Sequence, residues 1–313
     1  MRNPAFTLWS SDARPDGFAD EIVFTIGPDA GEEVRLVEAS EADLMNERVP
    51  AEDVHRIQTN YPTQLHSSIS SIVWGFMNTT IPPLDNENVR RAINFAVDRA
   101  QVLGLYGGPT AGAITCQLVP PAIAGYEPYC PYTIDPSPAG GWHAPDLTTA
   151  RQLVAASGTA GTAIKVSTNA RHAEAGAYLA GMLSELGYQA SSEVLDEYFP
   201  AVFVDRSVQI GMFEFAPDQA RTAAGWLREP GGCTGSFNPA VFCDTAVDAA
   251  IDEALAVQQD DPPTAWRRWA AIDRLITDAA PFIPLITPAS YDFVSARVGN
   301  YQSGILLDQL WVK

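Results

Sequence analysis

The sequence predicts an α/β protein with a largely parallel sheet, and three observations support this class. Strand-like and helix-like segments alternate from residue 146 to residue 257. Residues 86–103 predict an amphipathic helix, because Val89, Ile93 and Val97 recur on one face with charged residues opposite. Hydrophobic residues make up 46% of the 313 residues and charged residues 18%, so the chain can bury a core.

The first part of the chain predicts short elements. Residues 21–27 (EIVFTIG) are expected to form a strand that runs into a turn at Gly27-Pro28. Residues 31–39 and 51–58 each have the apolar spacing of a short helix. The apolar run at 69–79 is typical of a buried strand.

The predicted helix at 86–103 can be capped by Asp85 or Asn86, and Gly107-Gly108 closes the segment. Residues 107–147 are loop-like, with many Gly, Pro and aromatic residues. Further helices are expected at 146–157, 172–187, 197–205, 245–257 and 263–279, and strands at 162–168, 189–196, 208–215 and 282–287. One or two more strands are expected in 291–312. Pro284 favours an edge strand or a hinge crossing for 282–287 over a central strand.

The four cysteines form two pairs that are local in sequence, Cys116 with Cys130 and Cys233 with Cys243. Four cysteines permit three disulfide connectivities, and local pairing is the simplest. Disulfides would indicate an oxidising compartment. The alternative is a zinc site that includes His143, but neither pair has the CxxC spacing that structural zinc sites favour.

Charge and motifs exclude several function classes. The 19 basic and 38 acidic residues give a net charge of −19, which disfavours nucleic acid as a partner. No apolar run is long enough to span a membrane. Residues 1–15 contain three charges and no apolar stretch, so a signal peptide is not expected there. Phosphate-loop, dinucleotide, zinc-protease and serine-hydrolase motifs are all missing from the sequence, so neither an enzyme nor a bound cofactor is expected.

One block of residues resembles a known family. Asn78-Thr79, residues 82–85 (PPLD) and residues 89–99 (VRRAINFAVDR) look like the signature of family 5 extracellular solute-binding proteins. These are the oligopeptide-, dipeptide- and nickel-binding components of ABC importers. The agreement continues in chain order at 105–108, 119–121, 125–126, 146–153, 186–188, 242–244, 247–248 and 281–284.

The resemblance implies the type II periplasmic-binding-protein fold, in which two α/β lobes are joined by hinge strands. Residues 80–283 would form a nearly complete lobe II. Residues 1–79 and 284–313 would form part of lobe I, with 69–79 and 282–287 as the hinge strands. Family members are much longer, and their first half has no counterpart here.

The resemblance also implies a ligand site after the strand at 208–215. In the family an aromatic residue is followed by an aspartate that pairs with the α-ammonium group of a peptide. Phe215 matches the aromatic residue and Asp218 the acid, while Pro217 replaces the usual alanine. A carboxylate in a closed cleft binds an ammonium group strongly. The alternative is that Asp218 only begins a turn or caps a helix.

Phe213, Phe215 and Trp226 can line the same pocket, or they can be core residues, as aromatic residues in an apolar strand usually are. The implied function is to carry a peptide or similar amine-bearing solute to an ABC permease, outside the cytoplasm. A ligand-sensing module of a regulatory protein and a truncated remnant are the alternatives. A nickel or other metal ligand is disfavoured, because the predicted cleft loop contains no histidine.

Overall fold

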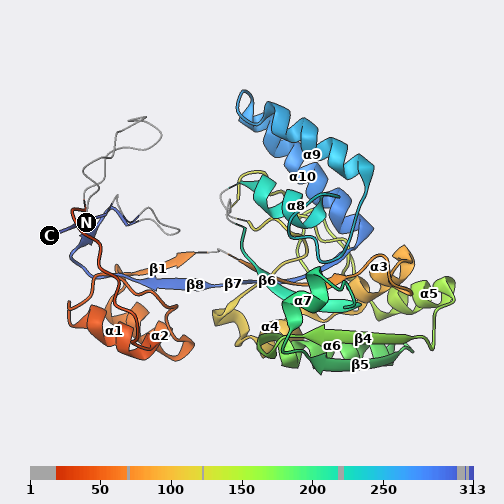
Figure 1. Cartoon of the computed structure of the whole chain (residues 1–313), viewed down its shortest axis with the longest axis horizontal. Coiled ribbons are helices and arrows are strands. Elements are labelled where there is room, and N and C mark those ends of the chain that lie inside the picture. Colours follow the sequence, from red (N-terminus) through yellow and green to blue (C-terminus); the bar gives the residue numbers. More distant parts are fainter. Residues whose placement is uncertain (1–18, 69–70, 122, 218–221, 302–306, 308–309) are drawn as a thin grey trace. The chain divides into compact units, whose positions relative to one another are not determined.

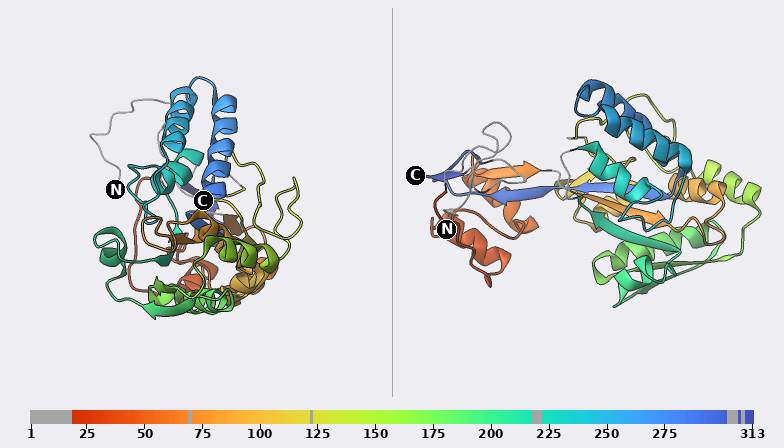
Figure 2. Two further views of the ribbon diagram at one scale, coloured as in Figure 1. Left: turned by 90° about the vertical axis from the view of Figure 1, so that its right-hand side faces the viewer. Right: turned by 45° about the horizontal axis from the view of Figure 1, so that its top comes forward.

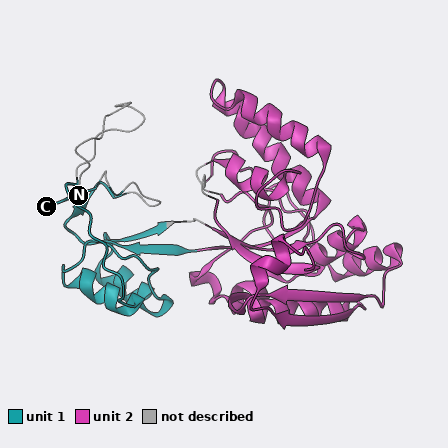
Figure 3. Ribbon diagram, viewed as in Figure 1, with its two compact units in different colours: residues 1–70, 289–313 teal, residues 71–288 magenta. Residues whose placement is uncertain are grey.

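A computed structural model describes residues 19–68, 71–121, 123–217, 222–301, 307 and 310–313. The chain forms two compact units (Figure 3). Unit 1 consists of residues 1–70 and 289–313, and unit 2 of residues 71–288. The lobe boundaries expected at 79/80 and 283/284 stay a prediction. The boundaries between the compact units lie at 70/71 and 288/289, because the strands at 72–77 and 282–288 belong entirely to the sheet of unit 2.

Unit 1 has a small core. Its described elements are helices α1 (Ala30–Glu38) and α2 (Ala51–Asn60) and strands β1 (Leu65–Ser68), β8 (Ser290–Phe293), β9 (Val298–Gly299) and β10 (Trp311–Val312). The strands pair antiparallel as β1 with β8 and β9 with β10. Asp29 caps α1 by accepting from the amide of Glu32 at 2.8 Å. The buried apolar cluster consists of Val34, Val37, Val49, Val54, Ile57 and Phe293.

The strand predicted at 21–27 is wrong for this structure. These residues form no regular secondary structure, and no described strand pairs with them. The apolar side chains of this segment, those of Ile22, Val23, Phe24 and Ile26, are exposed to solvent. A strand needs a partner for its backbone groups, and the sequence pattern cannot supply one.

Unit 2 is built on a sheet that has, among the described residues, six strands in the order β3-β7-β2-β6-β4-β5. Figure 1 labels β4, β5, β6 and β7 of this sheet. Their bounds are β2 (Ile72–Met77), β3 (Gly112–Ile114), β4 (Ala163–Thr168), β5 (Gln189–Val194), β6 (Ile210–Phe215) and β7 (Phe282–Pro288). Strands β4, β5 and β6 are parallel, as predicted for the middle of the chain. Strand β2 runs antiparallel to β6 and β7, so the whole sheet is mixed.

Helices cover both faces of this sheet. They are α3 (Glu87–Ala96), α4 (Arg99–Leu105), α5 (Leu147–Ser157), α6 (Ala173–Glu185), α7 (Tyr198–Phe203), α8 (Ala223–Gly231), α9 (Thr245–Val257) and α10 (Pro262–Ala279). Helices α3 to α6 share one apolar core with the sheet, and α7 to α10 share another. Figure 2 shows α9 and α10 side by side on the second face. Strand β6 separates the cores, since Ile210 and Met212 join the first and Phe213 and Phe215 the second.

The single helix predicted at 86–103 is wrong, because the structure breaks it into α3 and α4. Val97 is extended at the end of α3. Asp98 then accepts hydrogen bonds from the amides of Ala100 and Gln101 and so begins a new helix. The apolar spacing continues across this break, which is why periodicity alone did not reveal it. Helix α8 and strand β3 were also not predicted.

Strand β7 lies inside the sheet between β3 and β2, so the expectation of an edge strand is wrong, while the alternative, a hinge crossing, stays a prediction. Pro284 is tolerated because the register between β2 and β7 shifts at Val73 and Trp74. Strand β3 pairs only with residues 286–288 of β7, so it does not need a backbone hydrogen bond from Pro284, which has no N–H group. The carbonyl of Pro284 instead accepts from Nε of Arg99 at 2.8 Å.

The polar residues Arg90, Asn94 and Arg99 of the block that carries the family resemblance are buried and stabilise the packing of unit 2. Arg90 donates to the carbonyl of Ala279 at the end of α10, where a cation is favourable. Asn94 donates to the carbonyl of Phe282 at 2.9 Å, next to the Pro284 carbonyl that Arg99 holds. Arg99 is fully buried, and burial lowers its pKa to about 10. These side chains tie α3 and α4 to α10 and β7.

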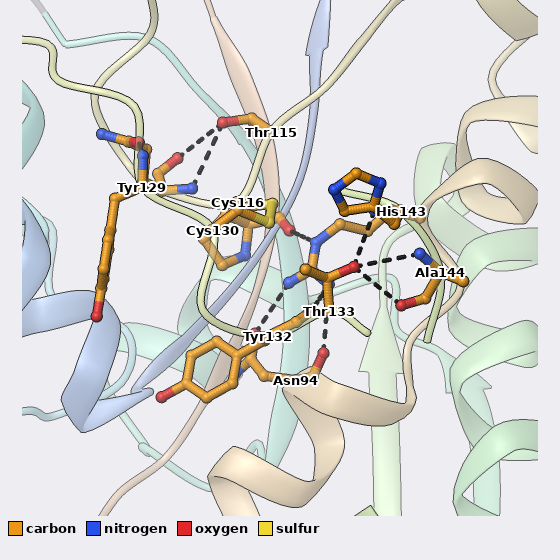
Figure 4. The surroundings of a disulfide bond; sticks show 12 residues. Asn94, Thr115, Cys116, Tyr129, Cys130, Tyr132, Thr133, His143 and Ala144 are labelled. Atoms are coloured by element: carbon orange, nitrogen blue, oxygen red, sulfur yellow. Dashed lines mark hydrogen bonds between the residues drawn. A yellow bond between two sulfur atoms is a disulfide. The ribbon is translucent and has the colours of Figure 1, made fainter. Parts of the chain in front are cut away.

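The predicted local pairing of the cysteines is confirmed. Cys116 is bonded to Cys130 and Cys233 to Cys243, with Cα separations of 5.0 and 4.3 Å. All four cysteines are thereby used, so the alternative zinc site does not form. Figure 4 shows the first disulfide inside the long loop, near Thr133. The Thr133 hydroxyl donates to the carbonyl of Ala144 and accepts from its amide, which orders the loop without regular secondary structure.

Candidate functional site

The carboxyl ends of the parallel strands β4, β5 and β6 meet at one edge of the unit 2 sheet. Strand β4 leads into α6 on the first face, and the adjacent strand β6 leads towards α8 on the opposite face. In open α/β sheets, ligands bind outside the carboxyl ends of two adjacent strands whose following connections lead to opposite faces of the sheet. The edge between β4 and β6 is therefore the candidate site within this unit.

Strands β4 and β6 separate towards this edge. They pair at only one described position, Val166 with Ile210. Beyond it, the hydroxyl of Tyr198 on α7 accepts from the amide of Met212 at 2.8 Å and donates to its carbonyl at 2.9 Å. Gly211 makes room for this contact, since a Cβ there would clash with the Tyr198 hydroxyl and the Phe76 ring. The Tyr198 side chain thus bonds to backbone groups of β6 that a neighbouring strand would otherwise pair with.

A charged pair lies at the end of these strands. Glu214 of β6 forms an ion pair with Arg171, which follows the end of β4. The hydroxyl of Ser71 donates to Glu214 at 2.7 Å. The Glu214 side chain is 13% exposed and that of Arg171 is 60% exposed. The carboxylate is therefore held inside while most of the guanidinium faces solvent.

His172 and Tyr106 form a second polar contact at this edge. The His172 ring is 2% exposed, and burial lowers its pKa to about 4, with the charge of Arg171 acting in the same direction. Burial also raises the pKa of Tyr106, so its hydroxyl stays protonated. A neutral imidazole and a protonated phenol can share one hydrogen bond, which joins the Tyr106 hydroxyl to Nδ1 of His172.

This arrangement is suited to binding an anionic group. The exposed guanidinium can form a charge-assisted hydrogen bond with a carboxylate. Glu214 is already engaged by Arg171 and Ser71, and His172 is neutral and buried. Among the described residues, no three His, Cys, Asp or Glu side chains gather to hold a metal ion. No helix in the described part of the chain could cross a membrane.

The predicted ligand residues are placed as follows. Asp218 lies outside the described residues. Phe213, Phe215 and Trp226 are 4%, 6% and 0% exposed in the second core of unit 2. Trp226 meets Phe215 edge to face at 6.0 Å, and Phe213 contacts Phe76. Their burial favours the packing alternative that the sequence left open, although Phe215 still borders the segment that carries Asp218.

Sequence reasoning missed Arg171, Glu214 and Tyr198. A signal for Arg171 was present, because polar residues come directly after the strand predicted at 162–168, at the carboxyl end of a parallel strand. Glu214 is the acidic residue in an otherwise apolar strand, which marks it in the same way. Tyr198 could not have been found, since its role depends on two strands that diverge in space.

The chain matches the model of bacterial extracellular solute-binding proteins, family 5 Middle, over residues 2–227. It belongs to this family. Among curated members, the glutathione-binding protein GsiB of Escherichia coli K12 is 26% identical over 257 residues, 76% of this chain and 46% of GsiB. The GsiB protein of Salmonella paratyphi A is 26% identical over 227 residues, 67% of this chain and 41% of that protein. The chain thus spans about half the length of the family members it matches.

Comparison with solved structures confirms the predicted type II periplasmic-binding-protein fold. The clavulanic acid biosynthesis oligopeptide binding protein 2 has a TM-score of 0.77 at 22% identity, over 92% of this chain and 56% of its own. HbpA2 from Haemophilus parasuis has a TM-score of 0.74 at 19% identity, over 93% and 57%. DppA from Helicobacter pylori, in complex with the peptide STSA, has a TM-score of 0.67 at 17% identity, over 91% and 55%. GsiB, the oligopeptide binding protein 2 and DppA are named as binding proteins.

Proposed function

We propose that this chain is part of a solute carrier that binds a peptide or a similar amine-bearing solute for uptake through an ABC permease. The observation that carries the proposal is the divergence of β4 and β6 at a topological switch point, in a chain of the family 5 solute-binding proteins. That edge offers an exposed guanidinium at Arg171, and Asp218 follows in sequence just beyond β6.

The charges at this edge suit a zwitterion. A peptide has an ammonium group at one end and a carboxylate at the other. Asp218 is proposed to pair with the ammonium group, as the family resemblance implies, and Arg171 can pair with a carboxylate. Both contacts would strengthen when closure of the protein excludes water.

The proposed location is outside the cytoplasm. Two disulfides support it, because disulfides persist in oxidising compartments. The family is described as extracellular, which agrees with this location. The proposed partner is therefore a membrane permease that accepts solute from the outer side.

The proposal is tested by calorimetry on the protein with both lobes present. Glutathione, the peptide STSA and an N-acetylated STSA are titrated separately. We expect at least one free-amine ligand to bind, and acetylation to weaken binding, because it removes the ammonium charge. Asp218→Asn should cost about 2–5 kcal/mol of binding free energy by leaving that charge unpaired. The 313-residue chain by itself is expected not to bind.

Asp196→Asn is the matched control, since Asp196 is an exposed acid after the neighbouring strand β5. It should leave the affinity unchanged. Equal affinity of the wild type and Asp218→Asn would refute the anchor but leave the carrier standing. If neither glutathione nor STSA binds, a complex mixture of peptides is titrated next. Failure of that mixture to bind would refute the proposal that the protein is a peptide carrier.

A further inference from the structure

We propose that the disulfide between Cys233 and Cys243 is a thiol-exchange site, at which the thiolate of a small amine-bearing thiol attacks Sγ of Cys243. The site lies in the loop between α8 and α9 of unit 2. The inference concerns covalent chemistry at this loop and does not depend on the ligand site proposed above.

The two disulfides of the chain differ in their access to solvent. Cys116 and Cys130 are 5% and 2% exposed, and Figure 4 shows side chains of the long loop around them. Cys243 is exposed, and Cys233 is partly buried. A thiolate must approach a sulfur atom from solvent to attack it, so access decides which disulfide reacts. Of the four cysteines, Cys243 is therefore the one that an external thiolate reaches most easily.

The exchange forms one bond and breaks one. The incoming thiolate RS⁻ bonds to Sγ of Cys243 and is oxidised, while Cys233 is reduced, leaves as a thiolate and takes a proton from water. The product is a mixed disulfide between Cys243 and the small thiol. In the reverse step, the Cys233 thiolate attacks Cys243 and expels RS⁻, which restores the original disulfide.

The ends of the loop are held together by contacts other than the disulfide. The side-chain amide of Asn238 donates to the carbonyls of Gly232 and Phe242, at 3.1 and 2.6 Å. Its Oδ1 accepts from the amide of Phe242 at 3.1 Å. Gly232 and Phe242 each directly precede a cysteine of the pair. The two sulfur atoms therefore stay close to each other after their bond opens.

The middle of the loop is anchored to the rest of unit 2. Phe237 packs on the rings of Phe203 and Phe215, with both ring centroids 5.0 Å away. The amide of Thr79 donates to the carbonyl of Ala240 at 2.8 Å. Reclosure is then a reaction between groups that are already positioned, which favours it over a second attack from solvent. Exchange opens the disulfide locally and reversibly, without unfolding unit 2.

The charges beside the disulfide favour a cationic thiol. Asp244 directly follows Cys243 and is exposed, and Asp248 accepts from the amide of Cys233 at 2.9 Å. Two carboxylates beside the reacting sulfur attract an ammonium group and repel a carboxylate or a sulfonate. The net charge of −19 on the whole chain acts in the same direction.

The nearest charges on α8 do not change this preference. Glu229 accepts from the amide of Ser236 in the loop at 3.0 Å. Arg228 is adjacent to Glu229 in sequence, so the two opposite charges offset each other. The two aspartates therefore set the sign of the local potential, and a small thiol with an amine is the expected class of reactant.

The test incubates the protein, with both disulfides intact, with cysteamine, 2-mercaptoethanol or 2-mercaptoethanesulfonate at one pH and low salt. Reactions are stopped with acid, free thiols are alkylated, and mass spectrometry of peptides locates each adduct. We expect the small thiol on Cys243 and the alkyl group on Cys233, with Cys116 and Cys130 reacting about tenfold more slowly or less. Compared per thiolate, cysteamine should react about fivefold faster than the sulfonate, and about 1 M NaCl should remove most of this difference.

Asp244→Asn tests the role of charge, because asparagine caps a helix as well as aspartate does. It should lower the ratio of the cysteamine rate to the sulfonate rate about twofold. Asp260→Asn is the matched control, since Asp260 is an exposed acid at the other end of the 13-residue helix α9, about 20 Å away. It should leave the ratio unchanged.

Asn238→Ala tests whether the loop keeps the two sulfur atoms together. The cysteamine concentration at which mixed and closed disulfide are equal should be about tenfold lower in this variant, because Cys233 competes less well for Cys243. Circular dichroism and tryptophan fluorescence should show that the wild type stays folded when the disulfide opens. The proposal is overturned by equal reaction of the two disulfides, adducts that form first on Cys233, rates that do not depend on thiol charge, unfolding on opening, or an unchanged midpoint in Asn238→Ala.

Discussion

The hydroxyl of Tyr106 lies 2.5 Å from Nδ1 of His172, at the carboxyl edge of the unit 2 sheet. Tyr106 follows α4, and His172 ends the short 3-10 turn that links β4 to α6. The contact therefore joins two elements of the first sheet face. It also places a buried imidazole directly after Arg171, whose charge opposes protonation of the ring.

Stability should fall in acid because of His172. Its pKa is about 4 in the folded protein and near 6.5 when unfolded, so the unfolded chain binds the proton more readily. The stabilising contribution is present above pH 6.5 and is lost as the pH falls towards 4. The full effect is about 3 kcal/mol. Urea unfolding from pH 4 to pH 7 measures it against His172→Asn, which keeps a hydrogen-bonding group beside Tyr106 but does not titrate. A difference between the two proteins that does not change with pH contradicts the prediction.

Asp273 should act in the opposite direction. It is fully buried on α10 and accepts from Gln117 Nε2 and from the amides of Leu118 and Val119, at 2.7, 3.0 and 3.2 Å. Burial outweighs these donors and raises its pKa to about 6. The folded protein therefore binds this proton more readily than the unfolded chain, and the contribution is present below pH 3.8 and lost as the pH rises through 6.

The measurement is the difference in unfolding free energy between the wild type and Asp273→Asn. We expect the wild type to lose up to about 3 kcal/mol relative to this variant between pH 4 and pH 7. Asp260→Asn, an exposed acid in the turn before α10, is the control and should show no such trend. A wild type that gains stability relative to Asp273→Asn over this range would refute the assignment.

Arg99→Lys should destabilise the protein by about 2–4 kcal/mol. Arg99 donates to the carbonyls of Pro284 and Asn94 and to Oδ1 of Asn94, at 2.8, 3.2 and 3.2 Å. An ammonium group cannot reach all three acceptors in the same geometry, and each buried carbonyl left unpaired costs about 1–3 kcal/mol. Chemical unfolding gives the value. Arg151→Lys on the exposed side of α5 should change it by less than about 0.5 kcal/mol.

Gly211→Ala should cost about 1–3 kcal/mol, because the added methyl group displaces Tyr198 from the backbone of Met212. Gly181→Ala is the matched control on α6. Nothing lies within 4 Å of a Cβ there, so alanine should stabilise the helix by about 0.5–1 kcal/mol. Thermal unfolding of both variants should therefore shift in opposite directions. A Gly211→Ala protein as stable as the wild type would mean that the contact between Tyr198 and Met212 does not depend on the absence of a side chain at Gly211.

Most elements of unit 2 could be predicted from periodicity, because their apolar faces meet cores within the unit. The prediction failed where a single local bond or a distant partner decides the structure. Asp98 begins a new helix through its side-chain hydrogen bonds, although the apolar spacing runs on across it. Residues 21–27 have the composition of a strand, but pairing depends on another segment.

The candidate site was predicted less well than the fold. The resemblance pointed to the end of β6, and the structure places a charged pair there. The pair itself depends on Arg171 and Glu214 being brought together by strands that are not neighbours in sequence order. The residues that carry the family resemblance predicted packing better than ligand contacts. Arg90, Asn94 and Arg99 donate hydrogen bonds to backbone carbonyls of α10 and β7.

The pairing of β1 with β8 has a consequence for synthesis of the protein. Leu65 pairs with Phe293, so the two strands leave the ribosome separated by the whole of unit 2. Unit 2 contains all the described strands of its own sheet, so the formation of that sheet does not require β8. The apolar cluster of unit 1 differs, because Val34, Val37, Val49, Val54 and Ile57 precede unit 2 in the chain whereas Phe293 follows it. Phe293 can therefore join this cluster only after the whole of unit 2 has been synthesised.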